Sequence, residues 1–392
     1  MRGAGHGETA DLSQPTPRIF LLVPTFQPHD AVGNDVLGMY GILREAGYDA
    51  AIYAEHVHAD FAGITSKSRL DADDLWRDPQ AILIYHHAIA WDLGEQILRR
   101  SKNKIVIKYH NITPPEFFEP YVPRYYEYCV QGMEATRRLA QLHVNFVWGA
   151  SQYNNEDFIA LGIPRERCRV APPIHRIEDL AAAPLDAVIT GAYRDGVPNI
   201  LFVGAFRPNK GHLKALDVFA AYRRLSACPA RLFFVGSFDH LLAGYEERVK
   251  QYARWLEVFD DVFLAHSVTL SQLRSYYAMA SVFLCVSEHE GFCVPLVEAM
   301  HFRAPIVAWG AAAVGETCGG CGTILDEFDA MALARAIEEC LNNPALARSM
   351  ADRGRRRYET AFSPGAIRAR LLELVEEAHR SKPEDWPAEP RA

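Results

Sequence analysis

Short apolar runs rich in β-branched and aromatic residues alternate with helix-length segments along the first half of the chain. The runs lie at 18–23, 50–54, 81–85, 104–108 and 145–148. Helical patterns lie between them, at about 33–45, 93–100 and 124–142. Buried strands joined by helices pack in parallel, with helices on both faces of the sheet. This alternation therefore predicts a doubly wound parallel sheet.

A second series of the same kind follows segment 172–197, which is rich in Ala, Pro and Asp and has no sustained strand pattern. We interpret that segment as a domain linker. The strands predicted after it are 199–203, 231–235, 261–265, 281–285, 305–309 and 322–325. The helices predicted between them are 212–225, 270–279, 294–302, 328–341 and 345–359. The predicted fold class is α/β, with two doubly wound domains whose ligand site lies where the carboxyl ends of both sheets face a central cleft.

The same patterns set the expected domain limits. A disordered arm and a disordered tail are expected at the two ends, because both are polar and neither has any periodicity. An amphipathic C-terminal helix precedes the tail, and its return to the first domain is left open. The limits are 1–17 for the arm, 18–185 for the first domain, 186–362 for the second domain, 363–380 for the helix and 381–392 for the tail.

Composition excludes several classes of protein. The 392 residues carry 41 Lys and Arg against 49 Asp and Glu, so the net charge of −8 gives no electrostatic reason to expect a nucleic-acid partner. The eight cysteines follow no secretory leader, and we expect reduced thiols in the cytoplasm. No apolar run is long enough to span a bilayer. Peripheral contact with the inner face of the cell membrane is left open.

The most informative segment is 287–300, which directly follows a predicted strand and carries Glu290 and Glu298. If a helix begins near Val294, three loop amides point at the cleft together with the positive end of the helix dipole, which suits a diphosphate. These amides belong to Gly291, Phe292 and Cys293. Glu298 could accept hydrogen bonds from ribose hydroxyls, and Glu290 from a second sugar. The alternative is a solvated loop glutamate followed by an ordinary helix glutamate.

This segment resembles the E-x7-E motif of retaining nucleotide-sugar glycosyltransferases with the GT-B fold, in glycosyltransferase family four (glycosyl transferases group 1). The resemblance extends through 300–310, 314–325 and 202–211, and covers most of 18–380. It implies an acceptor-binding first domain and a donor-binding second domain, both Rossmann-like. It also implies a metal-independent enzyme without a cofactor, in polysaccharide, glycolipid or metabolite glycosylation.

The implied reaction moves a sugar from a nucleoside diphosphate to a hydroxyl of a glycan, a glycolipid or a small molecule. The leaving diphosphate would assist attack from the same face. Lys210 stands where the family lysine belongs. The family arginine is replaced by Ala205, and Arg207 is the candidate substitute. The resemblance makes Lys210, Glu290 and His110 the catalytic candidates.

The remaining donor-side candidates come from loops after predicted strands. Gly33 lies in the first such loop, and His110 would contact the donor sugar or help shield charge at its anomeric carbon. A packed strand-end histidine is the alternative for His110. The loops after 231–235 and 261–265 are expected to hold the base, through Gly236, Ser237, His266 and Ser267. Val294 completes the donor set at the helix start.

Acceptor candidates lie in the first half of the chain. His86 and His87 follow a predicted strand and could line the acceptor side of the cleft, and Asn111 follows His110. Segment 115–129 is rich in aromatic residues and contains Phe117 and Arg124. It is interpreted as an acceptor groove or a membrane-facing lip, with ordinary core as the alternative.

Two other functions remain open. A sugar-nucleotide epimerase of the same architecture would bind the nucleotide similarly but would need further acid and base carboxylates across the sugar. A nucleotide-sugar-binding protein without turnover is the third reading, and Ala205 is its best support. The sequence predicts no metal site, because no His pair has a convincing set of carboxylate or Cys partners.

Overall fold

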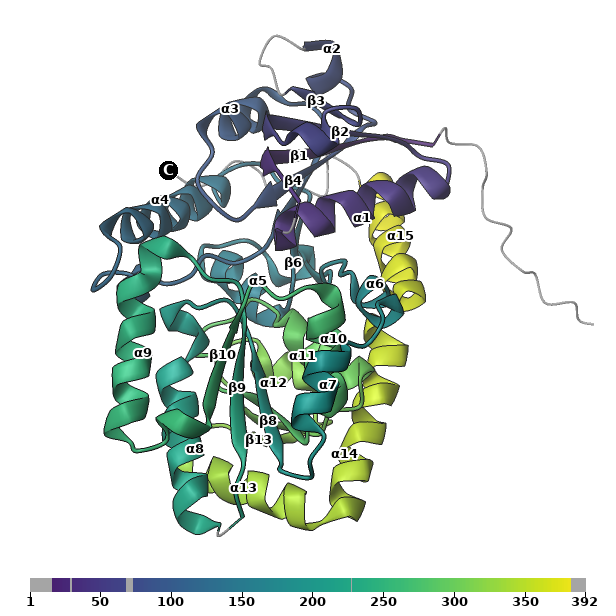
Figure 1. Ribbon diagram of the computed structural model, residues 1–392. Helices are drawn as coiled ribbons and strands as arrows, with labels where there is room; N and C mark the ends of the chain where they lie inside the picture. The colour runs from purple at the N-terminus through teal and green to yellow at the C-terminus, as the bar shows by residue number, and fades with distance from the viewer. Residues whose placement is uncertain (1–15, 29, 68–72, 227, 382–392) are drawn as a thin grey trace, which may run out of the picture.

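Two parallel sheets, each covered by helices on both faces, make up the chain in the computed structural model shown in Figure 1. The structure describes residues 16–28, 30–67, 73–226 and 228–381. The disordered arm and tail expected from the sequence fall almost entirely on 1–15 and 382–392, outside the described residues. The prediction of two doubly wound α/β units is confirmed.

The first sheet has the order β3-β2-β1-β4-β5-β6-β7 within the described residues, with every pair parallel. Its direction of winding reverses between β1 and β4, and the carboxyl ends of both open on the same side. Alternate residues of β1 enter different cores, Ile19 and Leu21 on one face and Phe20 and Leu22 on the other. The strands are β1 Arg18–Phe26, β2 Asp49–Val57, β3 Thr65–Lys67, β4 Ile82–His87, β5 Lys104–Tyr109, β6 Phe146–Gly149 and β7 Cys168–Val170.

The helices of this domain run between the strands, as the alternation predicts. They are α1 Ala31–Glu45, α2 Asp73–Trp76, α3 Asp92–Arg100, α4 Pro123–Leu139 and α5 Gln152–Ala160, with the short turns η1 Ala59–Phe61, η2 Pro115–Phe117 and η3 Arg165–Arg167. Helix α5 was not predicted. The edge strands β3 and β7 were not predicted either, because three-residue strands carry no usable periodicity.

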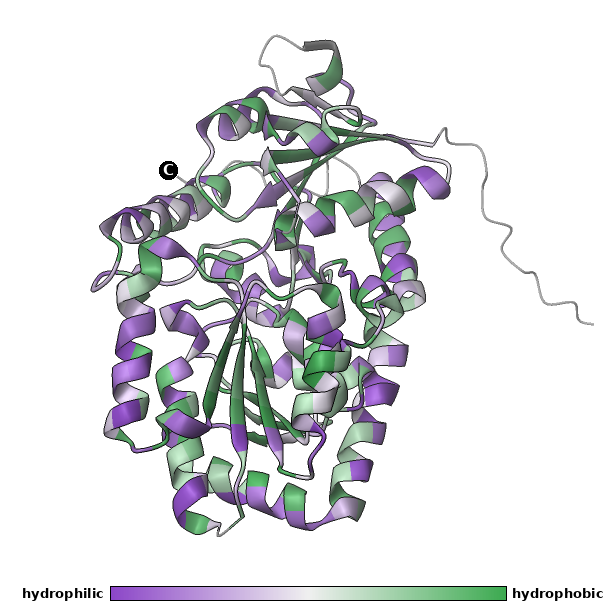
Figure 2. Cartoon of the chain, in the orientation of Figure 1, coloured by the Kyte–Doolittle hydropathy of each residue, from purple (hydrophilic) through white to green (hydrophobic). Residues whose placement is uncertain are grey.

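The second sheet has the order β10-β9-β8-β11-β12-β13 in the described part of the chain, again with parallel pairing. Figure 2 shows its central strands green over most of their length, while α9 is largely purple, so the sheet is buried between solvated helices. The strands are β8 Asn199–Val203, β9 Arg231–Gly236, β10 Val262–His266, β11 Val282–Cys285, β12 Ile306–Trp309 and β13 Thr323–Leu325.

The helices of the second domain surround this sheet on both faces. They are α8 His212–Leu225, α9 Ala243–Trp255, α10 Leu270–Met279, α11 Val294–His301, α12 Val314–Cys318, α13 Ala330–Asn342 and α14 Pro344–Arg357. The short turns are η4 Pro208–Lys210, η5 His240–Leu242, η6 Phe259–Asp261 and the π-turn η7 Tyr358–Phe362.

The segment interpreted as a linker is largely helical. It contains α6 Ile177–Ala182 and α7 Ala187–Tyr193, and Ile177 and Leu180 pack into the core of the second domain. These two residues thus pack with the second domain although they precede the expected limit at 186. The Ala and Pro content that suggested a linker belongs to two short helices and the turns around them.

The C-terminal helix α15 Pro364–Arg380 returns to the first domain. Leu371, Leu374 and Val375 are buried in the same core cluster as β1. Polar contacts reinforce this packing, since Tyr48 donates a hydrogen bond to Glu376 at 2.5 Å. The first domain is thus built from two separate parts of the chain.

All eight cysteines lie within the described residues and are free thiols. No helix of the described chain is long and apolar enough to cross a membrane.

Candidate functional site

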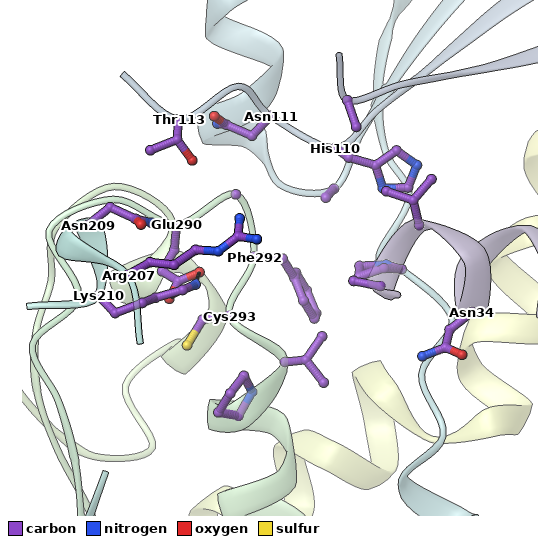
Figure 3. Close-up of a pocket in the computed structure, with 18 of the residues that line it drawn as sticks. Asn34, His110, Asn111, Thr113, Arg207, Asn209, Lys210, Glu290, Phe292 and Cys293 are labelled. Carbon is purple, nitrogen blue, oxygen red and sulfur yellow. Dashed lines mark hydrogen bonds and ion pairs between the residues drawn. The ribbon is translucent and has the colours of Figure 1, made fainter. Parts of the chain in front are cut away.

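A cavity of about 760 Å³ lies between the two domains. Two helix beginnings line it, α1 with Ala31, Val32 and Asn34, and α11 with Val294 and Pro295. Figure 3 shows His110, Asn111 and Thr113 on one wall, facing Arg207, Lys210 and Glu290 on the other. The predicted cleft at the carboxyl ends of both sheets is therefore present, and a helix from each domain points its positive end toward it.

Lys210 and Glu290 form a close ion pair on the second-domain wall. The Lys210 ammonium donates to both carboxylate oxygens of Glu290 at 2.8 Å (Figure 3). Burial is the largest single influence and lowers the pKa of Lys210, but the charge of Glu290, the neighbouring Cys293 and the hydrogen bonds to Glu290 together leave the pKa above its usual value. The lysine therefore stays cationic at neutral pH.

Two loops bring this pair together. The backbone carbonyl of Asn209 accepts hydrogen bonds from the amides of Glu288 at 2.9 Å and His289 at 3.2 Å, and the Asn209 side chain donates to the His289 carbonyl at 3.1 Å. Gly211 ends the first loop at φ 77°, where an added Cβ would lie 2.1 Å from the Val286 carbonyl oxygen. Only glycine permits this approach, which fixes Lys210 beside Glu290.

Arg207 lies at the opening of η4 and is exposed, and Figure 3 shows its guanidinium extending into the cavity beside the Lys210–Glu290 pair. The backbone beside Ala205 is occupied, since the Phe206 amide donates to the Ser237 carbonyl at 2.9 Å. The structure thus brings the displaced arginine into the same cavity as Lys210.

The predicted residues at the start of α11 also line the cavity: Gly291, Phe292, Cys293, Val294 and Glu298. Glu298 accepts a hydrogen bond from the Tyr277 hydroxyl at 2.6 Å. Burial raises the pKa of Glu298, while that hydrogen bond acts in the opposite direction. One oxygen of this carboxyl group is therefore already engaged.

The first-domain wall is formed by residues that follow β5. His110 and Asn111 line the cavity, and Asn111 has a left-handed backbone with φ 80°. The Asn111 side-chain oxygen lies 2.7 Å from Nε2 of His289, and its amide nitrogen donates to Asn154 at 2.8 Å. Asn111 thus bridges the two domains as well as facing the cavity.

The two domains touch along one edge of the cavity. The Ser151 hydroxyl donates to the Gly291 carbonyl at 2.8 Å. A Cβ at Gly291 would lie 2.8 Å from Cβ of Asn111 and 2.9 Å from the carbonyl oxygen of His110. The Glu316 carboxylate accepts from the Gln152 amide at 2.7 Å, at the start of α5. These contacts join the two domains along that edge.

His86 and His87 do not line the cavity, which corrects the expectation that they form the acceptor side. Their exposed fractions are 1% and 0%. The ring nitrogen Nε2 of His87 lies 2.7 Å from the hydroxyl of Thr136, and His86 lies behind His110. Both faces of β4 are covered by helices, so a polar residue at the strand end stays buried.

The predicted base-binding loops also lie outside the cavity lining, as does Gly33. Gly236 packs against the Gly204 carbonyl, where a Cβ would lie at 1.9 Å, and the neighbouring Ser237 is exposed, with its carbonyl accepting from the Phe206 amide at 2.9 Å. The His266 ring packs against Phe206 with centroids 4.6 Å apart, and Ser267 is exposed beside it. Gly33 is buried because the Gln27 carbonyl lies where its Cβ would be, at 2.4 Å.

The aromatic segment 115–129 packs mainly between the domains. Phe118 is 2% exposed and belongs to the core of the second domain, with Phe117 packed against it. The Tyr125 hydroxyl donates to Asp239 across the interface at 2.5 Å. Arg124 lies outside the cavity, with its guanidinium over the Tyr128 ring. Phe117 and Arg124 do not line the cavity, but Phe118, Tyr125, Tyr128 and Cys129 of the same segment do. The segment therefore contributes both to the core and to the cavity wall.

A buried polar cluster beneath His110 was missed from the sequence, although Lys108 inside a buried strand was a signal for it. Oδ2 of Asp35 lies 3.8 Å from Lys108, 3.9 Å from His86 and 3.7 Å from His110. Asp35, His86 and His110 are close enough to share an ion. The Lys108 ammonium already balances the Asp35 charge, so a dication would leave two uncompensated buried charges. The residues therefore fit a metal poorly.

The two facing parallel sheets and the cavity between them define a GT-B fold. The structure of Anabaena Alr3699/HepE in complex with UDP aligns over 92% of this chain and 100% of that chain, with a TM-score of 0.71 and 16% identity. Sucrose-phosphate synthase from Thermosynechococcus elongatus aligns over 92% and 98%, with a TM-score of 0.69 and 18% identity. The predicted GT-B fold class is confirmed.

Most of the second domain matches a known family of domains. Residues 192–357 match the family Glycosyl transferases group 1. The MMP alpha-(1->4)-mannosyltransferase of Mycolicibacterium hassiacum is 32% identical over 126 residues, which is 31% of this chain and 31% of that protein. The chain therefore carries a glycosyl transferases group 1 domain within a GT-B fold, as the resemblance of the two-glutamate motif predicts.

Proposed function

We propose that this protein is a retaining glycosyltransferase that moves a hexosyl group from a nucleoside-diphosphate sugar to a hydroxyl of a glycan, glycolipid or small-molecule acceptor. The observation that carries the proposal is the Lys210–Glu290 pair beside the start of α11, with Arg207 in the same cavity and His110 on the opposite wall. Cations and helix amides close together support the binding of a diphosphate, and the neighbouring carboxylate supports the binding of sugar hydroxyls.

The leaving diphosphate needs stabilisation as its negative charge develops. Lys210 and Arg207 supply fixed positive charge, and the α11 dipole adds to it. When a diphosphate engages Lys210, Glu290 loses part of its ion pair and can accept hydrogen bonds from sugar hydroxyls. In the empty cavity Lys210 and Glu290 pair with each other. In the occupied cavity Lys210 pairs with the diphosphate and Glu290 with the sugar, so both charges keep a partner in each state.

The acceptor would approach from the first-domain wall, between His110 and the start of α1. We assign no catalytic base, and the acceptor proton would pass to the leaving phosphate on the same face. Interdomain contacts at Ser151 and Gly291 exclude water from one edge of the cavity, which limits hydrolysis of the donor.

Two relatives support the donor and the reaction class. Alr3699/HepE was solved in complex with UDP, which supports a nucleotide donor. The Mycolicibacterium hassiacum relative is a mannosyltransferase, which supports hexosyl transfer. The cavity offers two carboxylates, Glu290 and Glu298, and the second is bonded to Tyr277. This leaves few groups for the acid and base chemistry of an epimerase.

Thermal unfolding with UDP, GDP, TDP and ADP and their common sugars tests the donor site. A ligand at 100 times its Kd stabilises the folded state by about 2.7 kcal/mol, a readily measured change. We expect one base to shift the melting temperature. A failure of every nucleotide to do so would overturn the donor site.

Transfer and hydrolysis of the selected donor then distinguish the three functions. Lys210→Met should lower turnover about 100-fold, because it removes the charge facing the leaving group. Lys214→Met is the matched control on α8, since Lys214 pairs with Glu288 and lies outside the cavity lining. Binding without turnover in the wild type would identify a binding protein, and release of an epimerised free sugar would identify an epimerase.

A further inference from the structure

A layer of ionisable side chains lies directly under the first-domain wall. Asp35, His86 and Lys108 are almost completely buried, with exposed fractions of 0%, 1% and 0%. They come from α1, β4 and β5, and His110 is the member of the cluster that reaches the cavity. Burying three such groups is costly unless each of them is hydrogen-bonded or paired with an opposite charge.

His86 and His110 share one hydrogen bond. Nδ1 of His86 lies 3.0 Å from Nε2 of His110, and the rings stack with centroids 5.2 Å apart. One of these nitrogens must carry the proton and the other must accept it. This hydrogen bond uses Nε2 of His110, so Nδ1 is the His110 nitrogen that remains available to a ligand in the cavity.

The surroundings of Nε2, the other ring nitrogen of His86, determine which of the two tautomers is present. Nε2 of His86 is buried and has no hydrogen-bond partner among the described residues. A buried N–H without an acceptor is rarer in proteins than a buried acceptor without a donor. The proton of His86 therefore belongs on Nδ1, from where it is donated to Nε2 of His110. His110 must then carry its own proton on Nδ1.

The charges beneath the pair keep both rings neutral. Asp35 and Lys108 oppose each other at 3.8 Å, so the cluster adds no net charge. Burial, with a contribution from Lys108, lowers the pKa of His86 to about 3. Burial is also the main cause that holds the pKa of His110 well below its usual value, followed by the charges of Lys108, His86 and His87. Neither ring is an imidazolium near pH 7.

We propose that His86 is a positioning residue that holds His110 in the neutral Nδ1–H tautomer, so that His110 presents a hydrogen-bond donor to an oxygen of the transferred sugar. This inference rests on the proposed glycosyl transfer and adds the role of one residue in it. His110 then binds the sugar and does not act as a proton acceptor in the reaction. The Asp35–Lys108 ion pair lies beneath the two stacked rings and adds no net charge to their surroundings.

Nitrogen NMR of protein labelled with ¹⁵N-histidine reads the tautomer directly. The His110 signals are assigned from their loss in His110→Gln. We expect a pyrrole-type Nδ1 and a pyridine-type Nε2 in the wild type. His86→Leu should give a mixture of tautomers, and His86→Asn should restore the wild-type signals because its amide can donate from nearly the same position as Nδ1. A proton on Nε2 of His110 in the wild type would overturn the proposal, and so would unchanged signals in His86→Leu.

His87 provides the matched control. It is adjacent on β4 and equally buried, and its ring is bonded to Thr136, while only its backbone carbonyl accepts from the His110 amide. His87→Leu should destabilise the fold comparably and leave the His110 signals unchanged. With an active donor, His86→Leu should lower kcat/KM about tenfold relative to His87→Leu, the worth of one hydrogen bond. An equal loss of kcat/KM in both variants would show that His86 has only a structural role.

The NMR and kinetic readouts separate the two proposals. If no donor is turned over by the wild type, the proposed transferase fails while the tautomer result stands. If the donor is turned over but His110 carries its proton on Nε2, the positioning role of His86 fails and the proposed transferase stands.

Discussion

The two walls of the cavity hold their charged groups differently. The first-domain wall keeps Asp35 and Lys108 fully buried under a histidine pair, whereas the second-domain wall places Lys210 and Arg207 at the cavity itself. Lys210 and Glu290 retain side-chain exposures of 22% and 9%. A buried group can act only on its protein neighbours, while an accessible one can act on a ligand. Substitutions in the first wall should therefore appear mainly in stability, and those in the second mainly in binding.

Acid should have the largest effect on stability. The pKa values of His86, His87 and His212 are lowered to about 3, with burial as the main cause. A folded-state pKa below the unfolded value of about 6.5 gives stability that is present above pH 6.5 and is lost as pH falls toward 3. Between pH 7 and pH 5, each histidine should cost about 2 kcal/mol, or about 6 kcal/mol together.

Urea denaturation across this pH range measures the loss. His87→Leu is the matched variant, because it removes one of the three titrating groups without touching His110. Its unfolding free energy should be about 2 kcal/mol less sensitive to this change in pH. A wild-type stability that stays constant from pH 7 to pH 5 would contradict the neutral buried histidines of the first wall.

The buried ion pair of the first wall should give the next largest effect. Asp35→Asn or Lys108→Met leaves one buried charge without a partner and should cost about 3–5 kcal/mol of unfolding free energy. The double variant removes both charges and should recover most of that loss. In Asp35→Asn the side-chain oxygen of the new amide can still accept from the backbone amide of Ile174, which donates to Asp35 at 2.7 Å in the wild type. Additive losses in the double variant, measured in urea, would show that the two charges do not compensate each other.

Contact between the walls should have a smaller effect. In Gly291→Ala, the new methyl group would meet Asn111 and the His110 carbonyl at less than 3 Å. The walls must then separate, at a cost of about 1–3 kcal/mol, and donor affinity should fall with them. Gly244→Ala is the control, because an added Cβ there meets nothing within 4 Å. Calorimetry that finds both variants equally stable would mean that the contact is not tight.

Arg207→Ala should leave stability almost unchanged, because the side chain is exposed. Nucleotide affinity should nevertheless fall about tenfold, as expected for a charge-assisted contact to phosphate. Arg224→Ala, at the exposed end of α8, is the control for the loss of one positive charge. Isothermal titration with the selected nucleotide measures both, and equal affinity in the two variants would remove Arg207 from the donor site.

Much of the fold could be predicted because each buried strand is long enough to show its pattern. The main strands and α15 lie close to their expected ranges. The packing of the segment interpreted as a linker could not be predicted, because Ile177 and Leu180 are buried by a core that is distant in sequence. The Ala and Pro content of this segment reflects the turns around α6 and α7. It does not show that these residues pack against a distant part of the chain.

The site could be predicted where a residue type suited to the chemistry follows directly after a strand. Lys210, Glu290 and the start of α11 follow strand ends and do reach the cavity. The same rule failed for His86, because the covering helix decides whether a strand end is exposed. It failed for His266 because the Phe206 ring packs against it. Such covering depends on tertiary packing, which no local pattern encodes.

The crossover between the domains has a consequence for building chimeras. The Lys108 ammonium bonds the Ala171 carbonyl and Asp35 bonds the Ile174 amide, so the chain up to residue 174 is anchored to the first domain. Residues from Ile177 belong to the second, and α15 returns to the first after Phe362. A donor domain transplanted from a relative should therefore be inserted between two junctions, near residues 175 and 363. A single fusion point would give the first domain a foreign closing helix.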